Sequence, residues 1–408
     1  MNMTQPLPAK APVMSERKVS IIGALLVGIG PVSMALFTPA MPEIVRAFGT
    51  TEAAVKMALS SYFAGFAFAQ LVCGPLSDGY GRRPITFAFM AIYLVATVAA
   101  LLAPTIELLV LARFFQGVGA AVGVAISRAI VRDLFTNERS ARIMNLIGLI
   151  LGIGPALAPT LGGITLTLFG WHAIFVFMLI AGVVIILVVR FSMVETVARD
   201  LSRIHPAALM RSYRKLLTDP YFTMCSLVLG GGIGAIYALA TILPFILIDE
   251  AGLTPTEFGL GMLMQSGSFF FGSLVVRRMM RRMGAYRLVP IGLVFIACGS
   301  LACAASLSLL EPTFLSVMLP VGIFVFGNAF TMPAMTTASL AGYPHMAGAA
   351  ASMNGFFQMG GGLAGGIAAA IIGDPVVAMA TVIPAMGVTA VLAWLYWRTL
   401  PEPTIPMR

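Results

Sequence analysis

Long apolar segments are the feature that most constrains how this chain can fold. The segments 85–103, 173–189 and 288–310 are nearly uncharged, and each is close to the ~20 residues with which an α-helix crosses a hydrocarbon core. Only 10% of the 408 residues are charged and the mean hydropathy is +0.97, whereas a soluble chain carries about 25% charged residues. The apolar residues form continuous runs, unlike the alternating pattern of barrel strands. The sequence therefore predicts an all-α membrane protein.

Twelve such segments follow one another, and the polar stretch 193–218 separates the first six from the last six. We therefore expect an N-terminal six-helix half at 19–192 and a C-terminal six-helix half at 219–398, joined by a linker at 193–218 and flanked by polar tails at 1–18 and 399–408. The first segment has no clear cleavage site and is expected to remain as a span. The predicted spans are 19–39, 54–74, 85–103, 108–129, 141–168, 173–192, 220–246, 256–276, 287–309, 313–336, 348–372 and 377–397.

Positive charges lie almost entirely on one side of these spans. Of the 25 Lys and Arg residues, Arg46 and Lys56 fall on the other side and Arg113 falls inside a span, while the remaining 22 share one side. Because cationic loops are retained in the cytoplasm, that side and both termini are predicted to be cytoplasmic. Topology accounts for the net charge of +9, so we expect no nucleic-acid partner.

Residues suited to enzymatic chemistry are scarce. The chain shows no candidate nucleophile, carboxylate pair or phosphate-binding loop, so we predict that it is not an enzyme. The cysteines lie in apolar segments without metal-ligand spacing, and the histidines are isolated. We therefore predict no catalytic residue, metal or cofactor. The residues concerned are Cys73, Cys225, Cys298, Cys303, His172, His205 and His345.

The loop expected after the second span carries the most specific motif of the chain, Gly-Pro-Leu-Ser-Asp-Gly-Tyr-Gly-Arg-Arg-Pro at 74–84. Its glycines permit a tight turn and a close approach of helices. Asp78 and Arg82 can form an ion pair that latches one half against the other. The alternative is a basic loop that only fixes orientation, the role expected for the basic turn at 277–282 in the second half. The predicted latch residues are Gly74, Asp78, Gly81, Arg82 and Arg83.

The fourth span carries Arg113 and Gln116 in an otherwise apolar helix. A guanidinium at this depth is unfavourable unless it faces water, a partner or a cargo, so we expect Arg113 to point inward. The alternative is an arginine that snorkels toward the outer end of the helix. Arg113, Gln116 and Asp133 are the candidates for coupling or substrate binding.

The fifth span is rich in glycine and proline. Small residues at helical spacing let helices approach closely, and proline permits a bend. We expect a hinge, although generic close packing explains the glycines equally well. The hinge candidates are Gly152, Gly154, Pro155, Pro159 and Gly163.

Amide side chains occur on spans 2, 4, 5, 8, 10 and 11 and are absent from spans 3, 6, 9 and 12. Because amides avoid lipid, this distribution predicts a central cavity that outer helices support. Aromatic residues between the amides would give the cavity an adaptable lining. The predicted cavity residues are Tyr62, Phe66, Asn145, Tyr237, Gln265, Asn328, Asn354 and Gln358.

Together these motifs resemble the major facilitator superfamily, and within it the bicyclomycin and chloramphenicol resistance branch of drug/proton antiporters. Further matches lie at 38–42, 59–62, 127–134 and 343–348. The resemblance implies a major facilitator fold and export of small amphipathic molecules across a bacterial inner membrane in exchange for protons. Arg113 matches a motif of proton-coupled members, and the fifth span matches the antiporter motif. The chain departs from its relatives at Ala35, where they usually carry an aspartate.

Two other functions stay open. The chain is alternatively a carrier for a native metabolite, such as a sugar or an amino acid derivative, and not coupled to protons. A sensor or scaffold that no longer transports is the third class. Among the 16 acidic residues none falls in the middle of a predicted span, so we expect coupling, if present, to use Asp133 or a carboxylate at the outer mouth. We expect a monomer in the lipid bilayer.

Overall fold

A computed structural model describes residues 14–401, apart from the side chains at 137, 141, 145, 148–153, 155 and 203. The described residues form helices and connecting turns and contain no strand, which confirms the prediction of an all-α protein. In order the helices are α1 (Glu16–Phe37), α2 (Met41–Phe48), α3 (Glu52–Tyr80), α4 (Arg82–Leu101), α5 (Ile106–Ala120), α6 (Val122–Leu134), α7 (Asn137–Phe169), α8 (Trp171–Ser192), α9 (Pro206–Thr218), α10 (Pro220–Pro244), α11 (Pro255–Met283), α12 (Val289–Leu309), α13 (Phe314–Ala341), α14 (Ala347–Ile372) and α15 (Pro375–Trp397).

Within the described residues, 11 helical segments are long and apolar enough to cross a membrane. Two of them combine successive α-helices, because α1 continues into α2 through the short turn η1 (Thr38–Ala40) and α5 continues into α6. Helix α7 has 33 residues, of which Ala156–Phe169 is apolar and described. Counting α7, the helices match the twelve predicted spans.

Local sequence signals set the helix ends. Thr51 and Thr105 cap α3 and α5 by accepting hydrogen bonds from backbone amides that have no partner within the helix. Thr254 and Glu257 form a reciprocal capping box at the start of α11. Gly81, with φ of +104°, separates α3 from α4. The motif predicted as a loop is therefore mostly helical, and only Gly81 interrupts it.

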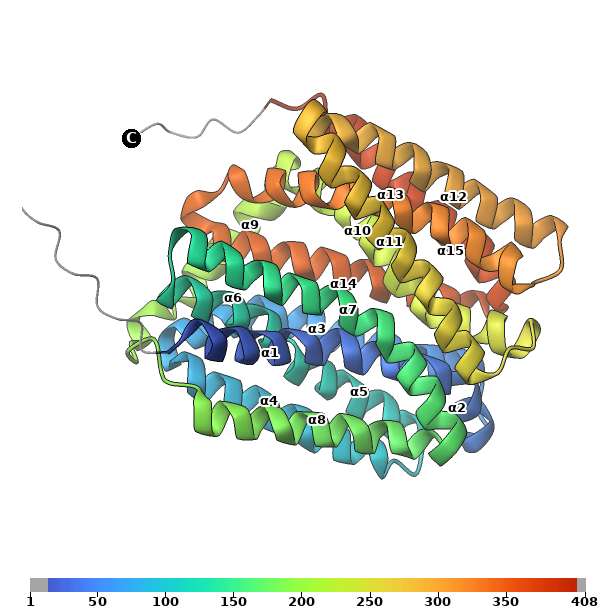
Figure 1. Ribbon diagram of the computed structural model, residues 1–408, viewed down its shortest axis with the longest axis horizontal. Coiled ribbons are helices and arrows are strands. Elements are labelled where there is room, and N and C mark those ends of the chain that lie inside the picture. Colours follow the sequence, from blue (N-terminus) through green and yellow to red (C-terminus); the bar gives the residue numbers. More distant parts are fainter. Residues whose placement is uncertain (1–13, 402–408) are drawn as a thin grey trace, which may run out of the picture.

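The helices form two bundles that lie against each other (Figure 1). Helices α1–α8, called here the N-terminal half, contribute most of one apolar core, and α10–α15, called the C-terminal half, form a second core. The main contacts between the halves are α3 with α14 and α7 with α11. Helix α9 lies between the halves in sequence and buries Tyr213 and Leu216 against α10 and α14.

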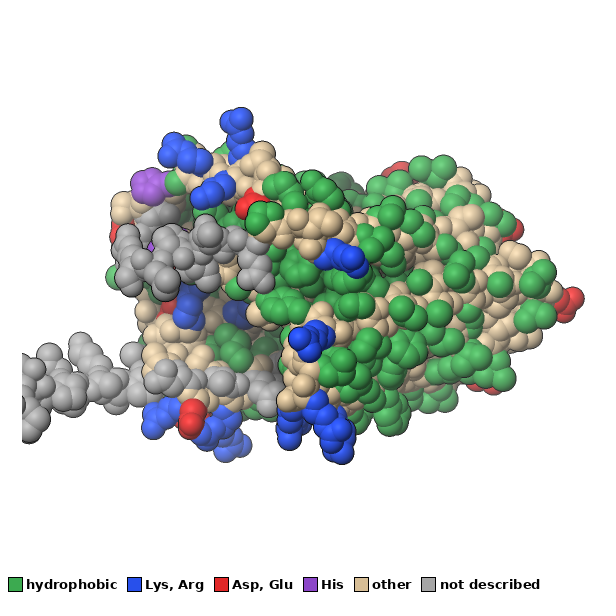
Figure 2. Space-filling model, turned by 90° about the horizontal axis from the view of Figure 1, so that it is seen from above, with side chains coloured by type: hydrophobic (Ala, Val, Ile, Leu, Met, Phe, Trp, Pro, Cys, Tyr) green, Lys and Arg blue, Asp and Glu red, His purple; other side chains and the backbone are tan. Residues whose placement is uncertain are grey.

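Charged side chains separate toward the two ends of the molecule. Figure 2 shows Lys and Arg gathered toward its left-hand end, and Asp and Glu at the opposite tip, with a broad hydrophobic band toward that tip. We call these the basic end and the acidic end. Large apolar side chains within the predicted spans are exposed, such as Val95 (70%), Phe271 (64%) and Leu301 (69%), which is expected of a surface that faces hydrocarbon.

Glycines allow α3 and α5 to touch through their backbones. A Cβ at Gly117 of α5 would lie 3.0 Å from the backbone nitrogen of Phe66, and a Cβ at Gly65 of α3 would lie 2.9 Å from the carbonyl carbon of Phe114. Small residues of this kind permit the close helix contacts that stabilise membrane bundles. The contact fixes the position of α5, which carries Arg113.

We expect Gly117→Val to destabilise the protein, because the added side chain would collide with the α3 backbone and crowding in a packed core costs about 1–3 kcal/mol. After stepwise heating, the purified variant should lose its monodisperse size-exclusion peak several degrees below the parent. Gly28→Val is the matched control, because nothing lies within 4 Å of a Cβ at that position. Identical melting of the parent and Gly117→Val would contradict so close a contact.

Candidate functional site

A cluster of charges joins α3 to α4 at the basic end. The Arg82 side chain is nearly buried and forms ion pairs with Asp78 (Nη1 to Oδ1, 2.5 Å) and Asp133 (Nε to Oδ2, 3.0 Å). Its Nη1 also donates a hydrogen bond to Ser77 Oγ at 2.6 Å. A guanidinium flanked by two carboxylates is a strong charge-assisted contact, and it ties α3, α4 and α6 together.

The carboxylate of Glu195 caps the first turn of α4. It accepts hydrogen bonds from the backbone nitrogens of Arg82 (2.9 Å) and Arg83 (3.0 Å). These amides have no partner within the helix, and a helix N-terminus favours negative charge. A Cβ at Gly81 would lie 2.7 Å from Glu195 Oε2. Glycine is therefore required here both for its positive φ and for the approach of this carboxylate.

The same cluster fastens the segment that follows α8. Asp133 accepts a hydrogen bond from Thr196 Oγ1 at 3.0 Å, and the backbone nitrogen of Asp200 donates to the carbonyl oxygen of Gly79 at 2.9 Å. Among the described residues, the ion pairs of Arg82 all lie within the N-terminal half. The cluster connects to the other half through this segment and α9. A latch role for Gly74, Asp78, Gly81, Arg82 and Arg83 stays a prediction.

Arg113 lies inside the N-terminal half with no exposed surface. Its guanidinium carbon is 4.4 Å from the ring centroids of both Phe37 and Tyr62, and its Nη1 donates a hydrogen bond to Gln116 Oε1. Its Nε and Nη2 have no hydrogen-bond partner among the described residues. Two aromatic faces and one amide therefore hold this cation. An arginine buried in this way does not snorkel to the surface.

A set of hydrogen bonds extends from this guanidinium to neighbouring helices. Gln116 Nε2 donates to Thr97 Oγ1 of α4 at 2.8 Å. The hydroxyl of Tyr62, which stacks on the guanidinium, donates to the carbonyl oxygen of Gly30 in α1 at 2.8 Å. Arg113 and Gln116 are thus part of the packing among α1, α3, α4 and α5.

Two of the predicted cavity amides make contacts inside the C-terminal half. Asn354 of α14 accepts a hydrogen bond from Ser226 Oγ at 2.8 Å and donates to Ser339 Oγ at 2.6 Å, which joins α10, α13 and α14. Asn328 of α13 is fully buried and donates to the carbonyl oxygen of Phe324 at 3.3 Å. An amide in an apolar bundle needs such partners. Asn354 therefore contributes to helix packing, whereas Asn328 bonds only within its own helix and its Oδ1 has no hydrogen-bond partner among the described residues.

Other predicted cavity residues lie on the helices by which the halves meet. Tyr237 of α10 faces Phe63 of α3, with ring centroids 5.5 Å apart. Gln265 of α11 is 7% exposed, and its Oε1 has no hydrogen-bond partner among the described residues. Gln358 of α14 is half-buried. A cavity role for Tyr237, Gln265 and Gln358 stays a prediction.

The remaining cavity candidates have different surroundings. Phe66 and Tyr62 pack together inside the N-terminal half, with ring centroids 6.3 Å apart. Phe66 also covers Gly30, where a Cβ would lie 2.6 Å from Phe66 Cε2. The side chain of Asn145 lies outside the described part of the chain.

Helix α7 continues unbroken through the predicted hinge and touches α11 near the acidic end. A Cβ at Gly163 would lie 2.7 Å from the carbonyl carbon of Pro255, and a Cβ at Gly259 would lie 2.6 Å from Thr160 Cα. Thr160 Oγ1 donates a hydrogen bond to the carbonyl oxygen of Gly259 at 2.9 Å. Small residues therefore create a backbone contact between the halves. A hinge role stays a prediction for Gly152, Gly154, Pro155, Pro159 and Gly163, of which Gly152 and Pro155 lie outside the residues whose side chains are described.

Lys56 makes a second contact between the halves at the acidic end. Its side chain has no exposed surface, and its Nζ lies 2.9 Å from Glu52 Oε2 in the same helix. The Nζ also donates a hydrogen bond to the carbonyl oxygen of Gly373, just beyond α14, at 3.0 Å. The ring centroid of Phe245 lies 4.9 Å away. A lysine of the N-terminal half is therefore enclosed by the C-terminal half.

An ion pair between Arg46 of α2 and Asp249 also joins the halves at this end, with 3.2 Å between Nη1 and Oδ1. Sequence reasoning treated Arg46 and Lys56 only as exceptions to the charge asymmetry. Their position on the side that carries few cations is the sequence signal that could have identified them as functional residues, because a cation on that side is explained by a specific partner.

Two helical bundles that meet through α3 with α14 and α7 with α11, with polar contacts between them at one end, are typical of membrane transport proteins. Comparison with known protein families supports this assignment to transport proteins. The Major Facilitator Superfamily model matches residues 23–369, so the chain belongs to this superfamily. Its members are transporters.

Curated relatives place the chain more closely. Multidrug resistance protein D of Escherichia coli is 26% identical over 91% of this chain and 93% of its own length. The bicyclomycin resistance protein homolog of Haemophilus influenzae is 26% identical, covering 94% and 98%, and the chloramphenicol resistance protein of Pseudomonas aeruginosa is 26% identical, covering 85% and 81%. These relatives confirm the resemblance to the drug/proton antiporter branch.

Solved structures show the same fold. A D-xylose-proton symporter superposes with a TM-score of 0.75 at 14% sequence identity, covering 95% of this chain and 98% of that one. A bacterial homolog of the human lysosomal transporter Spinster, in an inward-facing and occupied conformation, gives a TM-score of 0.71 at 15% identity, covering 95% and 98%. The major facilitator fold is therefore confirmed.

We expect Glu195→Gln to loosen the segment that follows α8, because a neutral amide is a weaker acceptor for the α4 amides than a carboxylate. Trypsin should cleave several-fold faster after the exposed Arg199 of the folded variant than in the parent, as measured by mass spectrometry of timed digests. Glu311→Gln, an exposed position at the acidic end, is the control. Unchanged cleavage after Arg199 in Glu195→Gln would show that this carboxylate does not hold the segment.

Proposed function

We propose that the protein exports amphipathic antibiotics and other drugs across the bacterial inner membrane. The basic end is the cytoplasmic end, because Lys and Arg are retained on that side, and both termini then face the cytoplasm. The observation that carries this proposal is the set of relatives named for multidrug, bicyclomycin and chloramphenicol resistance, each matched over most of its length. The chain acts as a monomer in this proposal.

Contacts of unequal kind at the two ends support a mechanism of alternating access. The acidic end is closed by the Lys56 and Arg46 contacts and by the touching backbones of α7 and α11. Export requires these contacts to break while the basic end closes, so that the path between the halves opens outward. The Arg82 cluster keeps the cytoplasmic end of the N-terminal half rigid as it moves. Through the segment after α8, the cluster transmits that motion to α9.

Energy coupling is the least conventional part of this proposal. Ala35 is buried in α1, at the position where the family resemblance implies an aspartate, and Arg113 has no carboxylate partner among the described residues. Guanidinium stays protonated and does not itself carry the exchanged proton. We assign the coupling to Asp133, whose carboxylate forms an ion pair with Arg82. Transport driven only by the cargo gradient is the alternative.

The proposal predicts that cells lacking their main exporters retain less chloramphenicol or another drug of a resistance panel when they express the protein. In proteoliposomes with clamped membrane potential, an imposed pH step should drive flux of the same drug, and Asp133→Asn should lose that response while keeping gradient-driven flux. Arg132→Gln, at an exposed neighbouring position, is the control. Absence of drug-dependent flux across the panel would refute drug export. A full pH response in Asp133→Asn would remove that residue from the coupling.

A disulfide across the acidic end is expected to stop transport. A Cβ at Gly366 would lie 3.4 Å from Ser60 Cβ, close to the separation of about 3.5–4.5 Å found in disulfides. In a background without the native cysteines, oxidised Ser60→Cys/Gly366→Cys should lose nearly all flux and regain it on reduction. Each single variant is the control. Undiminished flux in the fully crosslinked protein would contradict opening at this end.

A further inference from the structure

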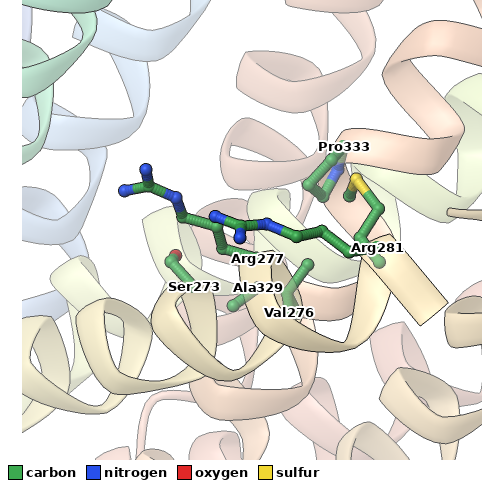
Figure 3. A pocket seen from close by; sticks show the side chains of 7 residues that line it. Ser273, Val276, Arg277, Arg281, Ala329 and Pro333 are labelled. Atoms are coloured by element: carbon green, nitrogen blue, oxygen red, sulfur yellow. The ribbon is translucent and has the colours of Figure 1, made fainter. Parts of the chain in front are cut away.

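A pocket of about 480 Å³ lies between α11 and α13 near the basic end. Its walls carry two guanidinium groups, one hydroxyl and several apolar side chains. Figure 3 shows the arginine side chains extending in the same direction along α11. The residues of this pocket used below are Ser273, Val276, Arg277, Arg281, Ala329 and Pro333.

The pocket opens on the side of α11 that is directed between the halves. Gly259, which touches α7, is separated from Ser273 by fourteen residues and Ser273 from Arg277 by four, close to whole turns of 3.6 residues. These three positions therefore share one face. Figure 1 shows α7 and α11 together at the acidic end and apart at the basic end. The side of α11 that carries the exposed Phe271 is a different face.

The charge of the pocket is uncompensated. Arg277 and Arg281 are exposed, and among the described residues no carboxylate lies within ion-pair distance of either guanidinium. One turn of helix separates the two groups, which can therefore approach one bound anion together. Guanidinium presents a planar fork of donors that matches the oxygens of a carboxylate or phosphate.

The preference of the cytoplasmic side for positive charge does not explain why Arg277 and Arg281 line the pocket. Arg278 and Arg282 stand in the same turns and supply the same positive charge to the basic end, yet neither lines the pocket. The floor and walls at Val276, Ala329 and Pro333 are apolar. A ligand that satisfies the whole pocket therefore combines an anionic head with an apolar body.

We propose that this pocket is a binding site for the oxyanion head, phosphate or carboxylate, of an amphipathic molecule that enters from the basic end. Arg277 and Arg281 bind the oxygens, Ser273 donates a further hydrogen bond, and the α13 wall contacts the apolar part. This inference rests on the proposed export function, and it narrows the class of exported molecules to amphipathic anions. A phospholipid headgroup of the inner leaflet offers the same chemistry as a soluble cargo.

The test is calorimetric titration of the purified full-length protein, in a neutral maltoside detergent, with hexyl phosphate as the anionic probe. Hexanol and hexylammonium are the matched neutral and cationic probes. Arg277→Gln/Arg281→Gln should weaken hexyl phosphate binding by at least about tenfold, since hydrogen bonds to charged groups are lost. Arg278→Gln/Arg282→Gln removes the same charge outside the pocket and should stay within about twofold of the parent, as surface charges contribute little.

Equal losses in the two double variants, or no preference of the parent for hexyl phosphate over hexanol, would overturn the proposal. If the pocket double variant is not monodisperse, Arg277→Ala alone is titrated and judged in the same way. Nanodiscs separate the two sources of the anion. Competition by phosphatidylglycerol, relative to phosphatidylcholine, assigns the pocket to a lipid headgroup, and unchanged affinity assigns it to a soluble molecule.

The two proposals fail separately. Drug flux that persists when hexyl phosphate binding is absent refutes the anion site and leaves the exporter standing. Pocket-dependent hexyl phosphate binding in a protein that moves no drug of the panel refutes drug export and leaves the anion site standing.

Discussion

The scarcity of partners for charge inside an apolar bundle is the constraint on which the rest of this structure depends. An ionised side chain removed from water must meet an opposite charge, oriented hydrogen-bond acceptors or an aromatic face. Arg82 meets two carboxylates, Lys56 meets Glu52 and a carbonyl oxygen, and Arg113 meets two rings and an amide. Each charge therefore marks a place where helices are held in a defined arrangement.

The contacts of these charged side chains fall into two sets according to the helices that they join. The Arg82 contacts lie within the N-terminal half, so they hold that half as one body. The Lys56 and Arg46 contacts cross between halves and are few, so they are suited to repeated breaking. This division of contacts supports the alternating access that we propose. The exposed arginines of the α11 pocket belong to neither set and stay available to a ligand.

Hydropathy was sufficient to predict the all-α fold and the number of spans, because hydrocarbon tolerates only backbones that satisfy their own hydrogen bonds. The pairing of Asp78 with Arg82 could also be predicted, since the two residues lie only four positions apart in one short motif. The contacts of Glu195 with Arg82 and of Gly373 with Lys56 could not be predicted, because more than one hundred residues of sequence separate the two partners in each contact. The amide of Asn354 was assigned to the cavity from its type alone. Its hydroxyl partners on other helices are visible only in three dimensions.

The most direct test of this account is the distance between the halves at both ends, measured by double electron–electron resonance in a background without native cysteines. One pair of spin labels stands at Glu107→Cys and Glu311→Cys at the acidic end, and the other at Arg142→Cys and Arg282→Cys at the basic end. When Lys56→Met and Asp249→Asn remove the closing contacts, the acidic-end distance should lengthen and the basic-end distance should shorten. Distances that stay unchanged, or that change in the same direction, would contradict closure of the acidic end by these residues.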